Sequence, residues 1–178
     1  MDRRIALASL GACAWPGGLA ARAAVPLRSL AVMRIELQDD NLNPATVADQ
    51  ERRLLEARAQ LQQLLVRHGL YRVLDAAPAA ELLDRLHARH AYVYQCDDCI
   101  LQVGGLLGAE LVMSSWVQKV SELILNFNVQ IHDVALQRLV LSKSVDMRGN
   151  NDESWTRAVD YLVRDMAAKR AANPRYGQ

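Results

Sequence analysis

The chain of 178 residues is 51% apolar, contains 5% aromatic residues with a single Phe, and carries a formal net charge of +1. This length suits one domain with one sizeable core, which aliphatic side chains must largely fill because aromatic residues are scarce. The near-neutral charge argues against a protein that binds nucleic acid by electrostatic attraction.

The first 23 residues have the pattern of a secretory signal peptide. Arg3 and Arg4 precede a short apolar run, and residues 21–23 have the small-x-small form of a cleavage site. In an alternative interpretation, Cys13 ends a lipobox-like segment and is lipidated, which would anchor the protein to a membrane. No later stretch approaches the ~20 apolar residues that a transmembrane helix needs. We therefore expect an exported, periplasmic protein.

Residues 29–95 alternate between strand and helix patterns. Residues 29–37 begin as a continuous apolar run and end in alternation, as in a strand that is buried near its start. Residues 91–95 fit either a short strand or a loop. The expected elements before them are a strand at 29–37, a helix at 46–68, a strand at 70–74 and a helix at 75–90.

The second half of the chain predicts a helix, a three-stranded meander and a closing helix. Residues 123–132 alternate cleanly between apolar and polar side chains, which is typical of a strand with one buried face. Only Ser121 and Glu122 separate them from the preceding strand, so the two strands should form a hairpin. The other elements are a helix from Cys96 that ends at Gly108, strands at 112–120 and 139–145, and a last helix capped by Asn151.

The resulting order is β-α-β-α-α-β-β-β-α. It predicts an α/β (α+β) fold with one mixed sheet of about five strands and helices packed on that sheet. No repeat or linker divides the chain, so we expect three parts: a signal peptide at 1–23, a single domain over 24–170, and a frayed tail over 171–178.

Four short motifs resemble a family of small exported proteobacterial proteins without an assigned function. They are Cys96-Asp97-Asp98-Cys99, Gly108 to Val112, Lys119-Val120-Ser121, and Arg148 to Trp155. The most specific is the last one, with Arg148, Gly149, Asn151, Asp152 and Trp155.

This resemblance covers about residues 28–168 and extends to the N-terminal domain of TolB and to CsgG-type secretion lipoproteins. The sequence departs from the wider pattern at residues 135–137, where a Thr-Gly turn is usual. The resemblance implies a TolB N-terminal-like fold, a protein-interaction or assembly role in the cell envelope, and service to a periplasmic quinoprotein dehydrogenase system. It carries over no active site.

Cys96 and Cys99 are the one pair of residues in the sequence with the potential for chemical reactivity. At a helix start, exposed N–H groups stabilise a thiolate, which could attack disulfides. However, Asp97 and Asp98 disfavour a thiolate, the position is not the first strand-to-helix turn of a thioredoxin fold, and no cis-proline candidate lies opposite. In an exported protein we therefore expect a structural disulfide, with a redox-active disulfide as the alternative.

No metal or cofactor is expected. His87 and His90 lie three residues apart and could share a helix face, but without an evident third ligand we expect them to be surface histidines. Cys96 and Cys99 would need two more ligands, and there is no second CxxC. The signatures of serine hydrolases, P-loop proteins, zinc proteases and dinucleotide-binding enzymes are absent, so no catalytic residue is assigned.

Three functions remain open. The first is a non-catalytic periplasmic protein-interaction or assembly module with an envelope protein as its partner and an open oligomeric state. The second is a thiol-disulfide redox protein acting through Cys96 and Cys99, and the third is a small-ligand carrier, which requires a pocket.

Lys119 is either a recognition residue or a strand-edge lysine that discourages aggregation. The candidate interaction surface comprises Trp116, Lys119, Asn126, Asn128, Gln130 and His132.

Overall fold

The computed structural model describes residues 26–40 and 43–178. The predicted signal peptide and the alternative lipidation site Cys13 lie outside the described residues. Within the described part of the chain, five strands form one mixed sheet that carries four α-helices. The strands are β1 (Ser29–Asp39), β2 (Arg72–Leu74), β3 (Leu111–Lys119), β4 (Ile124–Asp133) and β5 (Arg138–Arg148). The helices are α1 (Val47–Arg67), α2 (Ala80–His87), α3 (Asp97–Leu106) and α4 (Asp152–Ala172).

The spatial order of the strands is β2-β1-β3-β4-β5. β1 pairs in parallel with both β2 and β3, because helices connect these strands. β3, β4 and β5 pair antiparallel as the predicted meander. The undecided residues 91–95 contain a short 3-10 helix, η3 (Val93–Gln95). None of the helices in the described residues is both long and apolar enough to cross a membrane.

The hairpin between β3 and β4 is confirmed, although its loop is longer than predicted. The Ser121 hydroxyl oxygen accepts hydrogen bonds from the backbone N–H groups of Leu123 and Ile124, both at 3.2 Å. This turn removes Leu123 from the strand, so a residue that the alternation assigns to the core is 72% exposed. The following apolar positions of β4, from Leu125 to Ile131, are buried as predicted.

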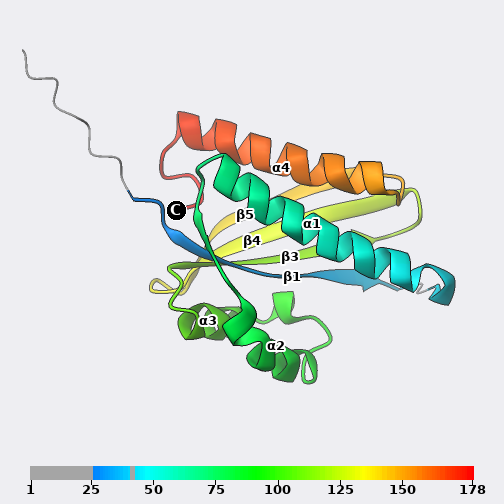
Figure 1. The fold of residues 1–178 in the computed structure, drawn as a ribbon, viewed down its shortest axis with the longest axis horizontal. Coiled ribbons are helices and arrows are strands. Elements are labelled where there is room, and N and C mark those ends of the chain that lie inside the picture. The colour runs from blue at the N-terminus through cyan, green and yellow to red at the C-terminus, as the bar shows by residue number, and fades with distance from the viewer. Residues whose placement is uncertain (1–25, 41–42) are drawn as a thin grey trace, which may run out of the picture.

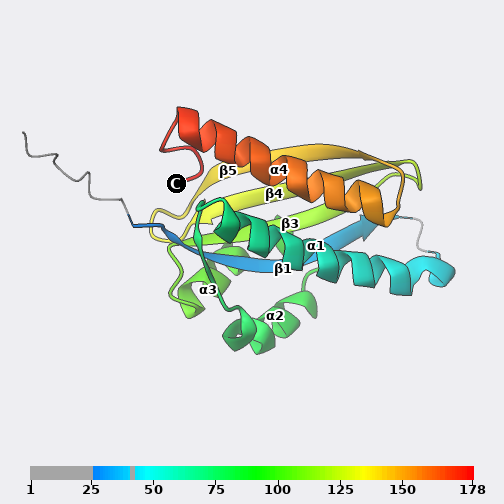
Figure 2. The same ribbon diagram turned by 45° about the horizontal axis from the view of Figure 1, so that its top comes forward.

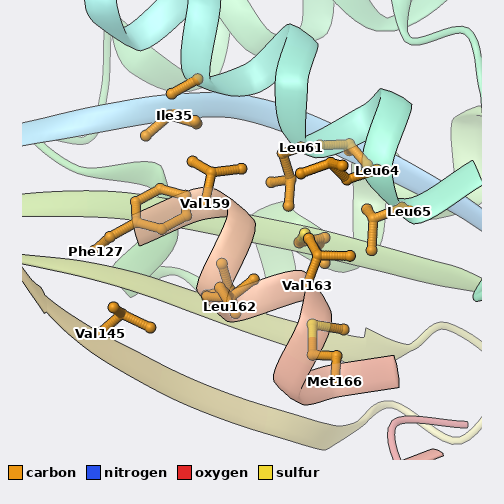
Figure 3. Packing of buried hydrophobic residues seen from close by; sticks show 14 of the residues in the cluster. Ile35, Leu61, Leu64, Leu65, Phe127, Val145, Val159, Leu162, Val163 and Met166 are labelled. Carbon is orange, nitrogen blue, oxygen red and sulfur yellow. The ribbon is translucent and has the colours of Figure 1, made fainter. Parts of the chain in front are cut away.

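The main core lies between the sheet and the pair α1 and α4. These two helices run side by side over one face of the sheet (Figures 1 and 2). Leu61 and Leu65 of α1 belong to one apolar cluster with residues of α4 and of the sheet. In Figure 3, Val163 of α4 lies near Leu65, and Val159 of α4 lies beside Phe127 of β4. Each of these helices buries one apolar stripe, as the helical spacing of its leucine and valine residues predicts.

A second, smaller core lies on the opposite face, under α2 and α3. Ile100 and Val103 of α3 and Leu83 of α2 pack against Ala31 of β1 and Val112 of β3. Among the described residues, this cluster contains none from β4 or β5. The helices α2 and α3 therefore lie mainly over the part of this face that β1 and β3 form (Figure 1).

The motif at residues 148–155 forms the corner between β5 and α4. Asn151 caps α4 by accepting a hydrogen bond from the Ser154 backbone N–H at 3.0 Å. The indole N–H of Trp155 donates to the side-chain oxygen of Asn150 at 3.0 Å, and Trp155 is buried. Gly149 has φ +87°, a conformation that other residues rarely adopt.

Within the predicted frayed tail, residues 171–175 are exposed, whereas residues 176–178 are half-buried or buried and dock on the domain. The hydroxyl of the buried Tyr71 donates to the Gly177 carbonyl at 2.6 Å. Arg170 donates to the Tyr71 hydroxyl oxygen at 2.7 Å and through Nε to the Tyr176 carbonyl at 2.5 Å. A buried hydroxyl needs an acceptor, so the tail completes the core at the end of the sheet where β1 starts (Figure 1).

Candidate functional site

The uncovered part of the sheet presents a continuous set of polar side chains. Asn126, Asn128 and Gln130 alternate along β4 on this side and are half-buried. The strand register places Asn128 between Trp116 of β3 and Ser144 of β5. We call this surface the open face; it comprises Trp116, Gln118, Asn126, Asn128, Gln130, Ser142, Ser144 and Asp146.

An aromatic pair borders the open face. The rings of Trp116 and Tyr94 stack with centroids 4.2 Å apart and an interplanar angle of 4°. The Tyr94 hydroxyl donates to the side-chain oxygen of Gln38 at 2.9 Å, and burial raises the pKa of Tyr94. The Glu36 carboxylate accepts the backbone N–H groups of Val93 and Tyr94 at 3.0 and 2.9 Å, which docks η3 on β1.

His132, a predicted surface residue, is buried under the start of α3. Its side chain is 4% exposed, and its Nε2 lies 3.3 Å from a carboxylate oxygen of Asp97. Burial lowers the pKa of His132, and Asp97 only partly opposes this effect. His132 is thus removed from the candidate surface because the first turn of α3 covers the end of β4.

Lys119 lies on the opposite face of the sheet from Trp116 and is therefore not part of the open face. It is neither a surface residue nor a strand-edge lysine. β3 is an interior strand, and the Lys119 side chain is 5% exposed. Its ammonium group bonds to Asp39 at 2.9 Å and to Glu122 at 2.6 Å. Burial alone would lower the pKa of Lys119, but the hydrogen bonds with Glu122 and Asp39 outweigh burial and raise it.

The residues of the 148–155 motif do not join the open face either, apart from the position of Arg148 at the end of β5. Asp152 accepts hydrogen bonds from Arg52 at 3.0 Å and Arg53 at 2.7 Å, which links α4 to α1. These exposed contacts add little stability, but they hold a defined geometry between the helices. The motif therefore has a structural explanation at the corner between β5 and α4.

Cys96 and Cys99 form a disulfide, with the Cα atoms 5.2 Å apart. Cys96 is the N-cap residue of α3, and its sulfur accepts the backbone N–H of Cys99 at 3.2 Å. Cys99 is buried in the smaller core, whereas Cys96 is half-buried. The bond therefore pins the start of α3 next to the docked η3.

His90 is a neighbour of this disulfide that sequence reasoning missed. Its Nε2 lies 3.4 Å from the sulfur of Cys99. His87, the predicted possible partner of His90, instead contacts the Glu36 carboxylate at 2.9 Å, so the two histidines do not share a site. No local pattern indicates the contact of His90 with Cys99, because the chain between them turns through η3.

A groove of about 560 Å³ lies between the exposed edge of β5 and α4. Ser144, Asp146 and Arg148 line it from β5, and Arg157 and Tyr161 line it from α4. The groove adjoins the open face through Ser144 and Asp146. The edge strand, the open face and the groove thus make one continuous surface.

The comparisons with known proteins identify a family and a fold. The family described as "Protein of unknown function (DUF2380)" matches residues 28–166. No curated protein matches the sequence. Lipoprotein GNA1162 from Neisseria meningitidis is similar over 79% of this chain and 96% of that one, with 15% identity and a TM-score of 0.50. Hypothetical protein CT253 from Chlamydia trachomatis is similar over 82% of this chain and 99% of that one, with 12% identity and a TM-score of 0.50.

TolB from Acinetobacter baumannii aligns with 84% of this chain but only 29% of its own length, at 13% identity and a TM-score of 0.47. Such low identities show a shared fold and nothing more specific. The predicted α+β fold with its five-stranded mixed sheet is confirmed. The kinship with CsgG-type proteins stays a prediction.

Proposed function

The chain belongs to the family described as "Protein of unknown function (DUF2380)", and from this starting point we propose that it is a non-catalytic protein-interaction module of the cell envelope. Its binding surface is the edge of β5 together with the open face. The partner is another envelope protein, and a periplasmic dehydrogenase system is the partner class that the sequence resemblance suggests.

The observation that carries this proposal is the long edge strand. β5 has eleven residues and pairs with β4 on one side only. An edge strand presents backbone donors and acceptors to which an extended peptide can add as a further strand. Ser142 and Ser144 are exposed in the middle of this strand, and their small side chains leave room for the approach of a peptide.

The side chains beside this edge suit a polypeptide partner. Asn126, Asn128 and Gln130 offer amide groups that both donate and accept hydrogen bonds. The groove between β5 and α4 can receive alternate side chains of an added strand. A small-ligand carrier needs a cavity that buries most of its ligand, whereas the open side of this groove along β5 fits an extended chain better than a small molecule.

An envelope location is part of the proposal. The pattern at residues 1–23 supports export, and GNA1162, which shares the fold, is described as a lipoprotein. Mass spectrometry of the protein from cells distinguishes the two processing routes. A mature N-terminus at Ala24 supports a soluble periplasmic form, a lipidated Cys13 supports an anchored form, and an intact Met1 contradicts export.

Site-specific photocrosslinking in intact cells tests the binding surface. A photoreactive residue at Ser144 should give a defined crosslinked product, whereas one at Ala59 on the opposite layer should not. Ser144→Lys should abolish a crosslink formed from Asn128, because it places a charged side chain on the edge strand β5, where it opposes the addition of a further strand. Equal products from Ser144 and Ala59, or no effect of Ser144→Lys, would contradict the proposal.

A second candidate function, a thiol-disulfide redox protein, is favoured by the surroundings of the disulfide. The Cys99 backbone N–H and His90 both lie within hydrogen-bonding reach of the sulfurs, and such groups stabilise a thiolate. Equilibration in glutathione buffers measures the reduction potential. A value below about −300 mV indicates a structural disulfide, and one of about −120 to −200 mV favours redox activity.

A further inference from the structure

Three potential metal ligands meet at the start of α3. The donor atoms of His90, Cys96 and Cys99 all lie within 4.8 Å of one another. Within residues 26–40 and 43–178, this is the one such group of histidine, cysteine and carboxylate side chains. Two of the three donors are joined in the disulfide, so the group is closed to a cation in this state.

The geometry is close to that of a thiolate and imidazole metal site. Zn–S bonds of about 2.3 Å and Zn–N bonds of about 2.0 Å at a tetrahedral angle place sulfur and nitrogen about 3.5 Å apart. The distance from His90 Nε2 to Cys99 Sγ is already 3.4 Å. The two sulfurs need only separate by side-chain rotation, for which a spacing of two intervening residues is common in zinc sites.

We propose that reduction of the Cys96–Cys99 disulfide creates a three-ligand site for a thiophilic d¹⁰ cation, Zn²⁺ or Cu⁺. A dithiol reductant supplies two electrons and two protons, breaks the S–S bond, and leaves as its own disulfide. The cation then displaces both thiol protons to solvent. His90 binds as neutral imidazole through Nε2, with its proton on Nδ1.

The charges around the cluster favour the metal-bound state over the free dithiolate. Asp97 and Asp98 in the first turn of α3 oppose the formation of two bare thiolates. A divalent cation neutralises those two thiolates, so the same carboxylates then favour binding. Cys96 and His90 are half-buried, which leaves the cation a route from solvent, while the buried Cys99 fixes one ligand in the smaller core.

Soft ligands select the cation. Two thiolates and one imidazole suit Zn²⁺ with a fourth position open to solvent, or Cu⁺ with three ligands, and they do not suit Mg²⁺ or Ca²⁺. Co²⁺ serves as a spectroscopic probe of the same geometry, since tetrahedral thiolate coordination produces a sulfur-to-cobalt charge-transfer band.

The test compares oxidised and phosphine-reduced protein after removal of the reductant without oxygen. The reduced protein should bind one equivalent of Co²⁺ with the charge-transfer band, and Zn²⁺ should displace it; competition with a chromophoric chelator measures Cu⁺. The oxidised protein should bind none. His90→Ala should weaken binding by about tenfold or more, and His68→Ala, at the exposed residue that follows α1, should leave it unchanged.

Two results would overturn the proposal: reduced protein without a charge-transfer band or bound metal, or His90→Ala with the affinity of the parent chain. Alkylation provides a check that needs no cysteine variant. One equivalent of Zn²⁺ should slow the reaction of the reduced thiols with iodoacetamide at least tenfold, and equal rates with and without Zn²⁺ would also overturn the proposal. None of these results depends on the function of the open face.

Discussion

The indole of Trp116 lies flat on the ring of Tyr94, with 4.2 Å between the ring centroids. Trp116 belongs to the middle of β3, and Tyr94 belongs to η3, directly before the disulfide segment. The contact therefore joins the open face to the segment that carries Cys96. Loss of this stack should loosen both the border of the open face and the approach of the chain to α3.

Tyr94→Ala should lower the free energy of unfolding by about 3 kcal/mol, because it removes a buried aromatic side chain and its stacking contact. Urea unfolding at neutral pH measures the change. Tyr161→Ala is the matched control, since this tyrosine is 54% exposed. A loss for Tyr94→Ala no larger than that of the control would mean that η3 is not held by the stack.

Trp155→Ala should lower the free energy of unfolding by about 3–5 kcal/mol, since Trp155 anchors the start of α4 in the main core. Trp155→Phe keeps most of the apolar contact and loses the hydrogen bond to Asn150, so it should cost less. Chemical denaturation monitored by circular dichroism compares the two. A near-neutral result for Trp155→Ala would show that α4 is not part of the cooperative core.

Stability should fall as the pH rises from about 10 to about 12, because burial raises the pKa of Tyr71 to about 12. The sign follows from proton binding: above the ordinary pKa of tyrosine, the unfolded chain releases this proton while the folded chain retains it. The loss should reach about 2–3 kcal/mol near pH 12.

Tyr71→Phe removes this ionisation, so its unfolding free energy should depend less on alkaline pH than that of the parent chain. It also removes the shorter of the two hydrogen bonds that the Gly177 carbonyl accepts, from Tyr71 at 2.6 Å and from Arg170 at 3.3 Å, which should cost about 1 kcal/mol at neutral pH. Urea unfolding from pH 8 to pH 11 checks both effects. Parallel pH profiles for the two chains would contradict the assignment.

Lys119→Met should lower the free energy of unfolding by about 3–5 kcal/mol, because it removes a buried cation that bonds to both Asp39 and Glu122. Lys169→Met, which removes an exposed ion pair with Asp165, is the control and should cost less than about 1 kcal/mol. Thermal unfolding at constant pH compares the two variants. Equal melting temperatures would show that the ion pair of Lys119 adds nothing to the fold.

Local sequence patterns were sufficient to predict much of the fold. The alternation from Leu125 to Ile131 indicates a strand with one buried face, and the position of Gly108 indicates the end of α3. These features depend on side-chain period and on backbone preferences over a few residues. The Cys96–Cys99 disulfide belongs to the same class, since its two cysteines are three positions apart in one helical turn.

The same local patterns were insufficient to predict which residues form the candidate interaction surface. Trp116, Asn126, Asn128 and Gln130 do share one face, but His132 is covered by α3 and Lys119 lies on the other side of the sheet. Alternation shows that two faces differ in polarity. It does not show how far a helix from elsewhere in the chain extends over either face.

By itself, the sequence determined the order and type of the elements, the α+β class and the disulfide spacing, because each of these follows from residues that are close along the chain. Only the tertiary structure decided the strand order, the docked C-terminal tail, the stack of Trp116 on Tyr94, and the position of His90 beside Cys99. These depend on contacts between distant residues, and such contacts are settled by which apolar surfaces cover one another when the helices pack on the sheet.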